Sequence, residues 1–212
     1  MLAVESAAML RILVATSNAG KLRDFAGAAS LHDVEVQGVP GFDSLPQVVE
    51  DGATFEANAR KKAEHYSRLV PRQLVLADDS GLEVEALGGA PGVHSARYAS
   101  AQPHDDSNSD DAANNARLLR ELGTMPEERR GARFVCVIAA ARDGRTLATF
   151  SGAADGRILT QPRGALGFGY DPLFFFPSLS RTFGELSAEE KAAVSHRGQA
   201  FGKFLAWVER NQ

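Results

Sequence analysis

Two adjacent aspartates, Asp78 and Asp79, are the residues of this chain that most directly suggest metal-assisted chemistry. Neighbouring carboxylates raise one another's pKa, so the pair is costly unless a cation relieves the repulsion. Mg²⁺ suits such a pair, because it binds one or two carboxylates and completes its shell with water and substrate phosphates. Side chains alternate along a strand, so we expect only one aspartate to face a cleft. An aspartate-rich turn is the alternative interpretation.

A second segment has the composition of a phosphate-binding turn. It consists of Thr16, Ser17, Asn18, Ala19, Gly20 and Lys21, between an apolar run and the expected start of a helix. Free N–H groups at a helix N-terminus attract anions, and small residues let a phosphate approach the backbone. The segment is not a Walker A loop, because Ala15 replaces the first glycine and Leu22 replaces the magnesium-binding hydroxyl. A capped helix start with a solvated lysine fits the pattern equally well.

Two further groups surround these segments. Glu50 and Asp51 precede the second expected helix, where acids serve as metal ligands or only as partners of the helix dipole. The run 167–172 (Gly-Phe-Gly-Tyr-Asp-Pro) suits a loop that lies against a flat ring, but a turn that packs its aromatic residues inward has the same composition. Each group alone therefore has a structural and a functional interpretation.

A last group contains three cationic or titratable side chains, Lys191, His196 and Arg197. We expect them in one helical stretch. There they either meet polyphosphate or base oxygens or form an ordinary solvated surface.

The elements that must position these residues follow from apolar runs and turn signals. Strands are expected at 10–16, 74–77, 82–87, 133–141, 145–151 and 173–176. Helices are expected at 22–29, from Thr54 to the residue before Pro71, from the polar loop 102–111 to Leu122, and at 201–208. Asp78 and Asp79 then follow a strand end, with 82–87 as its hairpin partner. The pattern predicts an α/β (mixed α+β) fold around a mixed sheet.

Composition excludes several classes of protein. The chain has 212 residues with a formal net charge of −4, which argues against a general nucleic-acid binder. No apolar stretch is long enough to span a bilayer, and the one cysteine, Cys136, excludes a disulfide framework and favours a reducing, cytoplasmic location. We interpret residues 1–9 as an N-terminal extension and 10–212 as one domain.

The order and wording of five segments resemble the inosine/xanthosine triphosphate pyrophosphatases, a Ham1-like family. The segments are TSNAGK (16–21), EDGATFEANA (50–59), ADDSGLEVEALGGAPGVHSARYA (77–99), GFGYDP (167–172) and EEKAAVSHRGQA (189–200). The resemblance covers the chain from about residue 10 to its end. It implies an elongated, two-lobed fold with a central cleft, Mg²⁺ dependence, a homodimer, and hydrolysis of ITP, dITP or XTP to the monophosphate and pyrophosphate.

The resemblance also implies a role for each matching residue. Asp79 is the catalytic carboxylate and a metal ligand, and Glu50 is the second ligand, although relatives often place acids at both positions that Val49 and Glu50 occupy here. The residues implied to bind substrate are Thr16, Ser17, Asn18, Ala19, Gly20, Lys21, Ser80, Phe168, Gly169, Tyr170, Asp171, Lys191, His196 and Arg197. Arg197 is expected to read the 6-oxo group of the base.

Two alternatives remain at this stage. A Maf-like pyrophosphatase would act on pyrimidine or other modified nucleotides, and a non-catalytic nucleotide-binding module would bind a triphosphate without turnover. A substrate panel separates all three.

Overall fold

The computed structural model describes residues 10–30, 32, 34–100 and 110–211. The predicted extension 1–9 and most of the predicted loop 102–111 lie outside the described residues. The described residues form a sheet in the order β2-β1-β3-β4-β5-β6-β7, in which β1 is parallel to β2 and β3 and the other pairs are antiparallel. The strands are β1 (Leu10–Val14), β2 (Val34–Gly38), β3 (Val75–Val84), β4 (Gly131–Arg142), β5 (Arg145–Ile158), β6 (Phe174–Phe176) and β7 (Arg181–Thr182). The predicted mixed sheet is confirmed.

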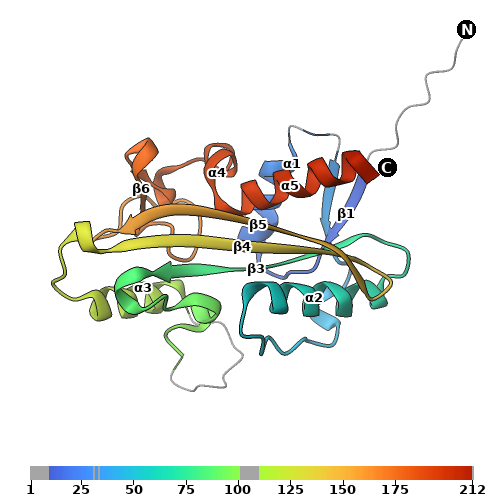
Figure 1. The fold of residues 1–212 in the computed structure, drawn as a ribbon, viewed down its shortest axis with the longest axis horizontal. Helices are drawn as coiled ribbons and strands as arrows, with labels where there is room; N and C mark the ends of the chain where they lie inside the picture. Colours follow the sequence, from blue (N-terminus) through green and yellow to red (C-terminus); the bar gives the residue numbers. More distant parts are fainter. Residues whose placement is uncertain (1–9, 31, 33, 101–109, 212) are drawn as a thin grey trace, which may run out of the picture.

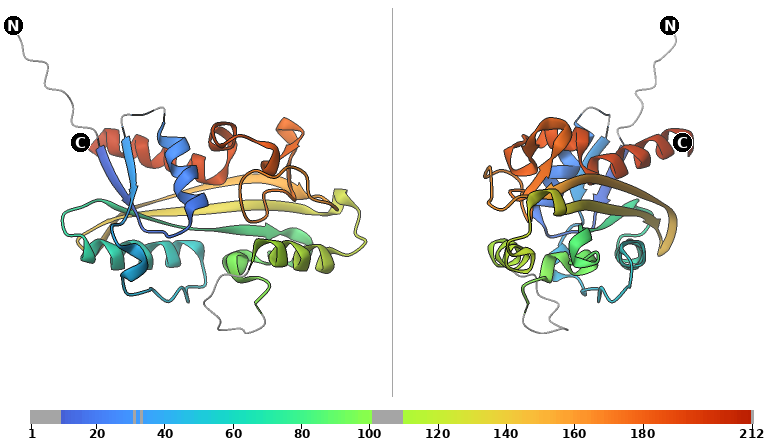
Figure 2. Two further views of the ribbon diagram at one scale, coloured as in Figure 1. Left: turned by 180° about the vertical axis from the view of Figure 1, so that it is seen from behind. Right: turned by 60° about the vertical axis from the view of Figure 1, so that its left-hand side comes forward.

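Helices cover both faces of this sheet, and the molecule is elongated along β3, β4 and β5 (Figure 1). One face carries α1 (Ala19–Ala29), α4 (Ala188–Val194) and α5 (His196–Asn211), and the other carries α2 (Phe55–Leu69) and α3 (Asp111–Leu122). Figure 2 shows the same layers from behind and from one end. Among the described residues, no helix is both long and apolar enough to cross a membrane.

Helix α2 illustrates how the sequence determines an element. Thr54 accepts a hydrogen bond from the backbone N–H of Ala57 (3.1 Å), which caps the helix start. Ala59, Ala63 and Tyr66 fall on one helical face and are buried against the sheet. The helix ends at Leu69, just before the predicted stop at Pro71.

Three apolar clusters form the core. One cluster lies between the sheet and the helices α1 and α5 and contains Phe25, Phe201 and Phe204. A second cluster lies under α2, and a third fills the far end of the sheet around Phe134 and Phe174. The cleft described below lies between these packed regions, so its walls rest on rigid elements.

The predicted hairpin between 74–77 and 82–87 is wrong. β3 runs unbroken from Val75 to Val84 and pairs with β4 throughout, so Asp78 and Asp79 lie within a strand. Gly81 suggested a turn, but a glycine is needed at this position for another reason. A Cβ there would come within 2.4 Å of the Gly92 carbonyl oxygen. The other predicted hairpin is confirmed, because Asp143 and Gly144 join β4 to β5 with positive φ angles of 51° and 77°.

The predicted single helical stretch for Lys191, His196 and Arg197 is also wrong. α4 ends at Val194, Ser195 adopts an extended conformation, and α5 begins at His196. The Ser195 hydroxyl accepts a hydrogen bond from the Gly198 N–H (3.1 Å), a typical N-cap contact. Two helices rather than one therefore carry these side chains.

Candidate active site

A cleft of about 430 Å³ opens beside β3, where its parallel neighbour stops. β1 pairs with β3 only through Leu13 and Val14, so the edge of β3 beyond Leu76 has no strand beside it. Crevices at such switch points of open sheets are common ligand sites. Residues that line the cleft include Thr16, Ser17, Asn18, Lys21, Glu50, Lys62, Asp78, Asp79, Ser80, Phe168, Gly169, Tyr170, Asp171, Lys191, His196 and Arg197. The structure thus brings most of the predicted site residues together.

Asp78 faces α1 and α5. Its Oδ1 lies 3.1 Å from Lys21 Nζ, and its Oδ2 accepts hydrogen bonds from Arg197 Nη2 (3.0 Å) and Ser80 Oγ (3.1 Å). Burial alone would raise the pKa of Asp78, but the charges of Lys21 and Arg197 outweigh it and hold that pKa well below its usual range. Asp78 is therefore a permanently ionised anchor for two cations.

Arg197 is held entirely by the protein in this arrangement. Besides its bonds to Asp78, it donates to Ser80 Oγ (2.8 Å) and to Asp24 Oδ2 (2.6 Å), and its side chain is only 2% exposed. Asp24 was not predicted from the sequence. A fork-shaped guanidinium that makes four hydrogen bonds to internal acceptors is suited to positioning its neighbours.

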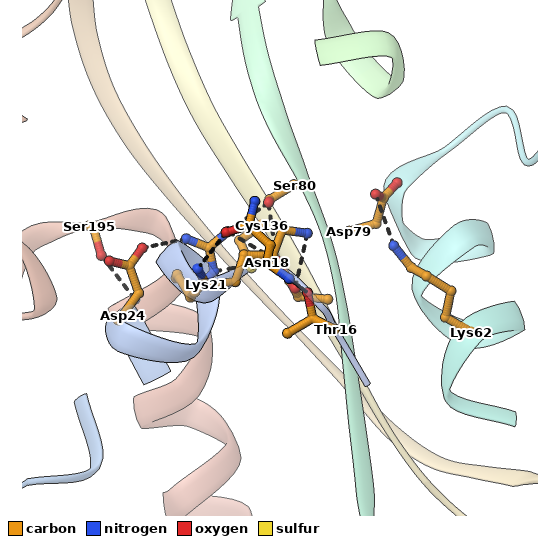
Figure 3. Close-up of polar contacts among 12 residues, drawn as sticks. Thr16, Asn18, Lys21, Asp24, Lys62, Asp79, Ser80, Cys136 and Ser195 are labelled. Carbon is orange, nitrogen blue, oxygen red and sulfur yellow. Dashed lines mark hydrogen bonds and ion pairs between the residues drawn. The ribbon is translucent and has the colours of Figure 1, made fainter. Parts of the chain in front are cut away.

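Asp79 faces the opposite side of β3, toward α2 (Figure 3). Its Oδ1 lies 3.4 Å from Lys62 Nζ, and its Oδ2 accepts a hydrogen bond from Asn58 Nδ2 (3.1 Å). The same Lys62 ammonium lies 2.7 Å from Glu50 Oε2. A single lysine thus bridges the two carboxylates predicted as metal ligands.

The electrostatics of this trio differ from those of Asp78. Burial raises the pKa of Asp79, and the charge of Lys62 opposes that shift without cancelling it. Burial acts to lower the pKa of Lys62, but the carboxylates of Asp79 and Glu50 outweigh it and raise that pKa. The ammonium is therefore charged and shows that the position between the carboxylates accepts a cation.

The donor set at this position fits Mg²⁺ rather than a fully protein-ligated ion. No group of three or more His, Cys, Asp or Glu side chains able to hold a metal occurs among the described residues. Mg²⁺ requires only one or two carboxylates, provided that water and substrate phosphates complete its shell. Glu50 and Asp79 offer that number.

The turn from Thr16 to Lys21 begins α1 as predicted. Asn18 is the N-cap, and its Oδ1 accepts from the Lys21 N–H (3.0 Å), while Thr16 Oγ1 accepts from the Asn18 N–H (3.1 Å). The Lys21 ammonium reaches back to Asp78 across the cleft edge. A positive charge and a helix N-terminus therefore lie beside the ionised Asp78 carboxylate.

The loop 167–172 closes the other end of the cleft. Asp171 accepts from the Phe168 N–H (2.8 Å) and from Lys191 Nζ (2.7 Å), and the Tyr170 hydroxyl donates to the Ser95 carbonyl (2.8 Å). Asp171 and Tyr170 are thus internal supports, each less than 5% exposed. Phe168 is the aromatic residue of this loop that remains partly accessible.

His196 lies in the wall between these regions. Its ring stacks on Phe134 with centroids 4.7 Å apart, and its Nδ1 is buried without a hydrogen-bond partner among the described residues. Burial and the nearby charges of Arg197 and Lys191 lower the pKa of His196 well below its ordinary value. The imidazole is therefore neutral at physiological pH.

Sequence reasoning missed Lys62, Asn58 and Asp24. A signal for the first two existed: both lie on the same face of α2 as Ala59 and Ala63, where a solvated residue is not expected. A charged residue within a buried helical face requires a partner. Asp24 gave no comparable signal, since its partner Arg197 is 173 residues away.

The fold and the cleft together place two carboxylates, Asp79 and Glu50, on one side of an open strand edge and a lysine at a helix start on the other. The Ham1 family model matches residues 12–207, and this chain belongs to that family.

Relatives and solved structures agree with the family match. The chain is 50% identical over 195 residues to a dITP/XTP pyrophosphatase of Geobacillus kaustophilus, covering 92% of each chain. It is 47% identical to a dITP/XTP pyrophosphatase of Syntrophobacter fumaroxidans, covering 93% of this chain and 84% of that one. The structure of the Staphylococcus aureus Ham1 protein matches with a TM-score of 0.79 at 40% identity, covering 95% of this chain and 100% of that one.

Proposed function

We propose that this protein hydrolyses non-standard purine nucleoside triphosphates (ITP, dITP and XTP) to the monophosphate and pyrophosphate, with Mg²⁺. The observation that carries the proposal is the bridge of Lys62 between Asp79 and Glu50, directly beside the turn from Thr16 to Lys21. The names of the relatives supply the substrate class.

Asp79 and Glu50 are the residues that would hold the metal ion. Mg²⁺ bound there would neutralise phosphate charge and make a water molecule more acidic. Asp79 lines the cleft, and hydrogen bonds from Asn58 and Lys62 orient its carboxylate. Hydrolysis by such a site depends mostly on positioning and charge stabilisation, because the transferred group itself needs little covalent help.

The opposite wall would hold the pyrophosphate. Lys21 is the cation nearest the helix start, and the N-terminus of α1 favours negative charge. Charge that builds on the leaving oxygens would be stabilised there. Asp78 holds Lys21 through an ion pair (3.1 Å), and Arg197 in turn binds Asp78 (3.0 Å).

Base selection would take place at the Phe168 end of the cleft. Lys191 Nζ lies 4.7 Å from the centre of the Phe168 ring, donates to Asp171 and forms an ion pair with Asp24 (3.4 Å). An ammonium has three donors, so one remains for a 6-oxo acceptor of a purine stacked near this ring. Adenine presents an amino donor at that position and would leave this remaining N–H of the buried ammonium without an acceptor. We therefore assign 6-oxo recognition to Lys191 in preference to Arg197, because the Lys191 ammonium lies closer to the Phe168 ring (4.7 Å) than the Arg197 guanidinium carbon does (5.7 Å).

A substrate panel tests the proposal. Purified protein with Mg²⁺ is expected to release pyrophosphate from ITP, dITP and XTP far faster than from GTP, ATP or pyrimidine triphosphates. Hydrolysis in ¹⁸O-labelled water locates the phosphorus attacked. Orthophosphate and a nucleoside diphosphate as primary products would contradict a pyrophosphatase. The predicted homodimer, tested by light scattering, and the cytoplasmic location remain predictions.

A further inference from the structure

We propose that Asp111 and Asn115, on the first two turns of α3, are positioning residues that set the Phe168 ring at the base end of the cleft. The proposal rests on the proposed function, because it concerns how that site recognises a base.

The two side chains hold one residue of the loop 167–172 from both sides of its backbone. The Gly169 N–H donates to Asp111 Oδ2 (2.7 Å), and the Gly169 carbonyl accepts from Asn115 Nδ2 (3.0 Å). Asp111 and Asn115 are four residues apart, so they lie on the same face of α3. The Gly169 carbonyl can only accept a hydrogen bond, so the Asn115 amide must turn its Nδ2, not its Oδ1, toward it.

Gly169 is a residue whose conformation needs such support. Its φ is +61°, a left-handed conformation that glycine adopts without steric cost but that an unrestrained loop would readily leave. It directly follows Phe168 and precedes Tyr170, whose hydroxyl is bound to the Ser95 carbonyl. Fixing both polar atoms of Gly169 therefore fixes the direction in which Phe168 leaves the loop.

The Phe168 ring is seated on the phosphate-binding turn. A Cβ at Gly20 would lie 2.5 Å from Phe168 Cδ1, so the ring packs directly on the backbone of the first turn of α1. Lys191 Nζ lies 4.7 Å from the ring centre, and the Arg197 guanidinium carbon lies 5.7 Å from it. Small rotations of the ring would change the space left for a base beside these cations.

We call the two hydrogen bonds from Asp111 and Asn115 to Gly169 the clamp. Helix α3, which carries both side chains, is itself anchored to the cleft wall. Asn114 accepts from the Ala99 N–H (2.7 Å) and donates to the Ala96 carbonyl (3.3 Å). Arg117 packs over the Tyr98 ring and donates to the Tyr98 carbonyl. The loop is consequently tied to α4 through Lys191 and to α3 through Asp111 and Asn115.

Three variants test the clamp: Asp111→Ala, Asp111→Asn and Asp110→Ala. Asp110 is a matched control, because it is an exposed neighbouring acid that makes no capping hydrogen bond. Losing a hydrogen bond to a charged group corresponds to about a tenfold change, so Asp111→Ala is expected to raise KM for ITP about tenfold with kcat nearly unchanged. Asp111→Asn keeps an acceptor for the Gly169 N–H and should restore KM. Asp110→Ala should match the wild type.

Equilibrium binding supplies a readout that turnover does not. By titration calorimetry, Asp111→Ala and Asn115→Ala should weaken binding of inosine monophosphate about tenfold and leave binding of pyrophosphate unchanged. An equal loss for both ligands, an unchanged KM, or failure of Asp111→Asn to restore KM would each overturn the proposal. If the wild type released no pyrophosphate from any nucleotide, the proposed function would fail instead, and the binding of inosine monophosphate would still report on the clamp.

Discussion

Asp78 and Asp79 are adjacent in the chain, yet they face opposite sides of β3 and bind different cations. Asp78 pairs with Lys21 and Arg197 on the α1 side, whereas Asp79 pairs with Lys62 on the α2 side. Burial raises the pKa of Asp79 more than Lys62 lowers it, whereas the charges of Lys21 and Arg197 outweigh burial and lower the pKa of Asp78. The predicted alternation along the strand is confirmed, but the expectation that only one aspartate faces the cleft is wrong, because both carboxylates line it.

The first prediction concerns Asp79. Replacing Asp79 with Asn keeps the hydrogen-bonding shape but removes the charge that would hold Mg²⁺. We expect kcat to fall at least about a hundredfold, the scale of losing one strong transition-state contact. EDTA should abolish the activity of the wild type, and added Mg²⁺ should restore it. Full activity of Asp79→Asn, measured as pyrophosphate release, would remove this carboxylate from the mechanism.

Lys62 carries the second prediction. The charge of Lys62 opposes the upward shift of the Asp79 pKa, so Lys62→Met should raise that pKa further. If ionised Asp79 is required, the acid limb of the pH profile of kcat/KM must move to higher pH. Lys61→Met is the matched control, because Lys61 is exposed and pairs with Asp51 (2.6 Å) away from β3. An unmoved acid limb in Lys62→Met would show that Asp79 does not need to be ionised.

The third prediction concerns acid stability. The folded-state pKa of Asp78 lies well below that of the unfolded chain, so below about pH 4 the unfolded state binds a proton that the folded state does not. The stability from this group is present above the unfolded pKa and is lost as the pH falls below it, by about 1.4 kcal/mol per pH unit. Asp78→Asn should therefore show a shallower loss of stability between about pH 4 and 2.

Urea unfolding followed by circular dichroism at several pH values measures this slope. The variant is expected to be less stable at neutral pH, because Arg197 and Lys21 lose their common partner. A slope that equals that of the wild type would mean that Asp78 is not ionised in the fold.

Local patterns predicted most of the fold. The apolar period of α2, its Thr54 cap and the Asp143-Gly144 turn are features of neighbouring residues, and the structure confirms them. The turn predicted at Asp78 to Gly81 is wrong because of contacts with distant parts of the chain. These polar residues stay in a strand because they pair with β4, and Gly92 packs closely against Gly81. Propensity alone does not contain such tertiary contacts.

Most members of the candidate site were predictable from the sequence, but Lys62, Asn58, Asp24 and the pairings were not. The turn before the first helix indicated Lys21, and the family resemblance selected Asp79 and Glu50 from the two acidic pairs. Which cation neutralises which carboxylate depends on side chains from elements far apart in the chain, such as Asp24 of α1 with Arg197 of α5. The engagement of Arg197 by internal acceptors in the wall of the cleft is a consequence of those pairings.

The last prediction tests that placement. Arg197 is 2% exposed at its side chain and donates to Asp78, Ser80 and Asp24, so it acts on every substrate through the residues it holds. Arg197→Ala should lower kcat/KM for ITP, XTP and the residual ATP activity by a similar factor, about ten- to a hundredfold. It should also destabilise the fold by about 3–5 kcal/mol, because Asp78 loses a buried partner.

Arg197→Lys separates the two effects. Lysine keeps a positive charge near Asp78 but lacks the fork that joins Asp78, Ser80 and Asp24 at once, so stability should recover more than activity. Measuring kcat/KM on the three nucleotides decides the role. A loss confined to ITP and XTP would mean that Arg197 leaves its internal acceptors and reads the 6-oxo group. The matching variant Lys191→Met should show that selective loss instead, because Lys191 retains a donor beside the Phe168 ring.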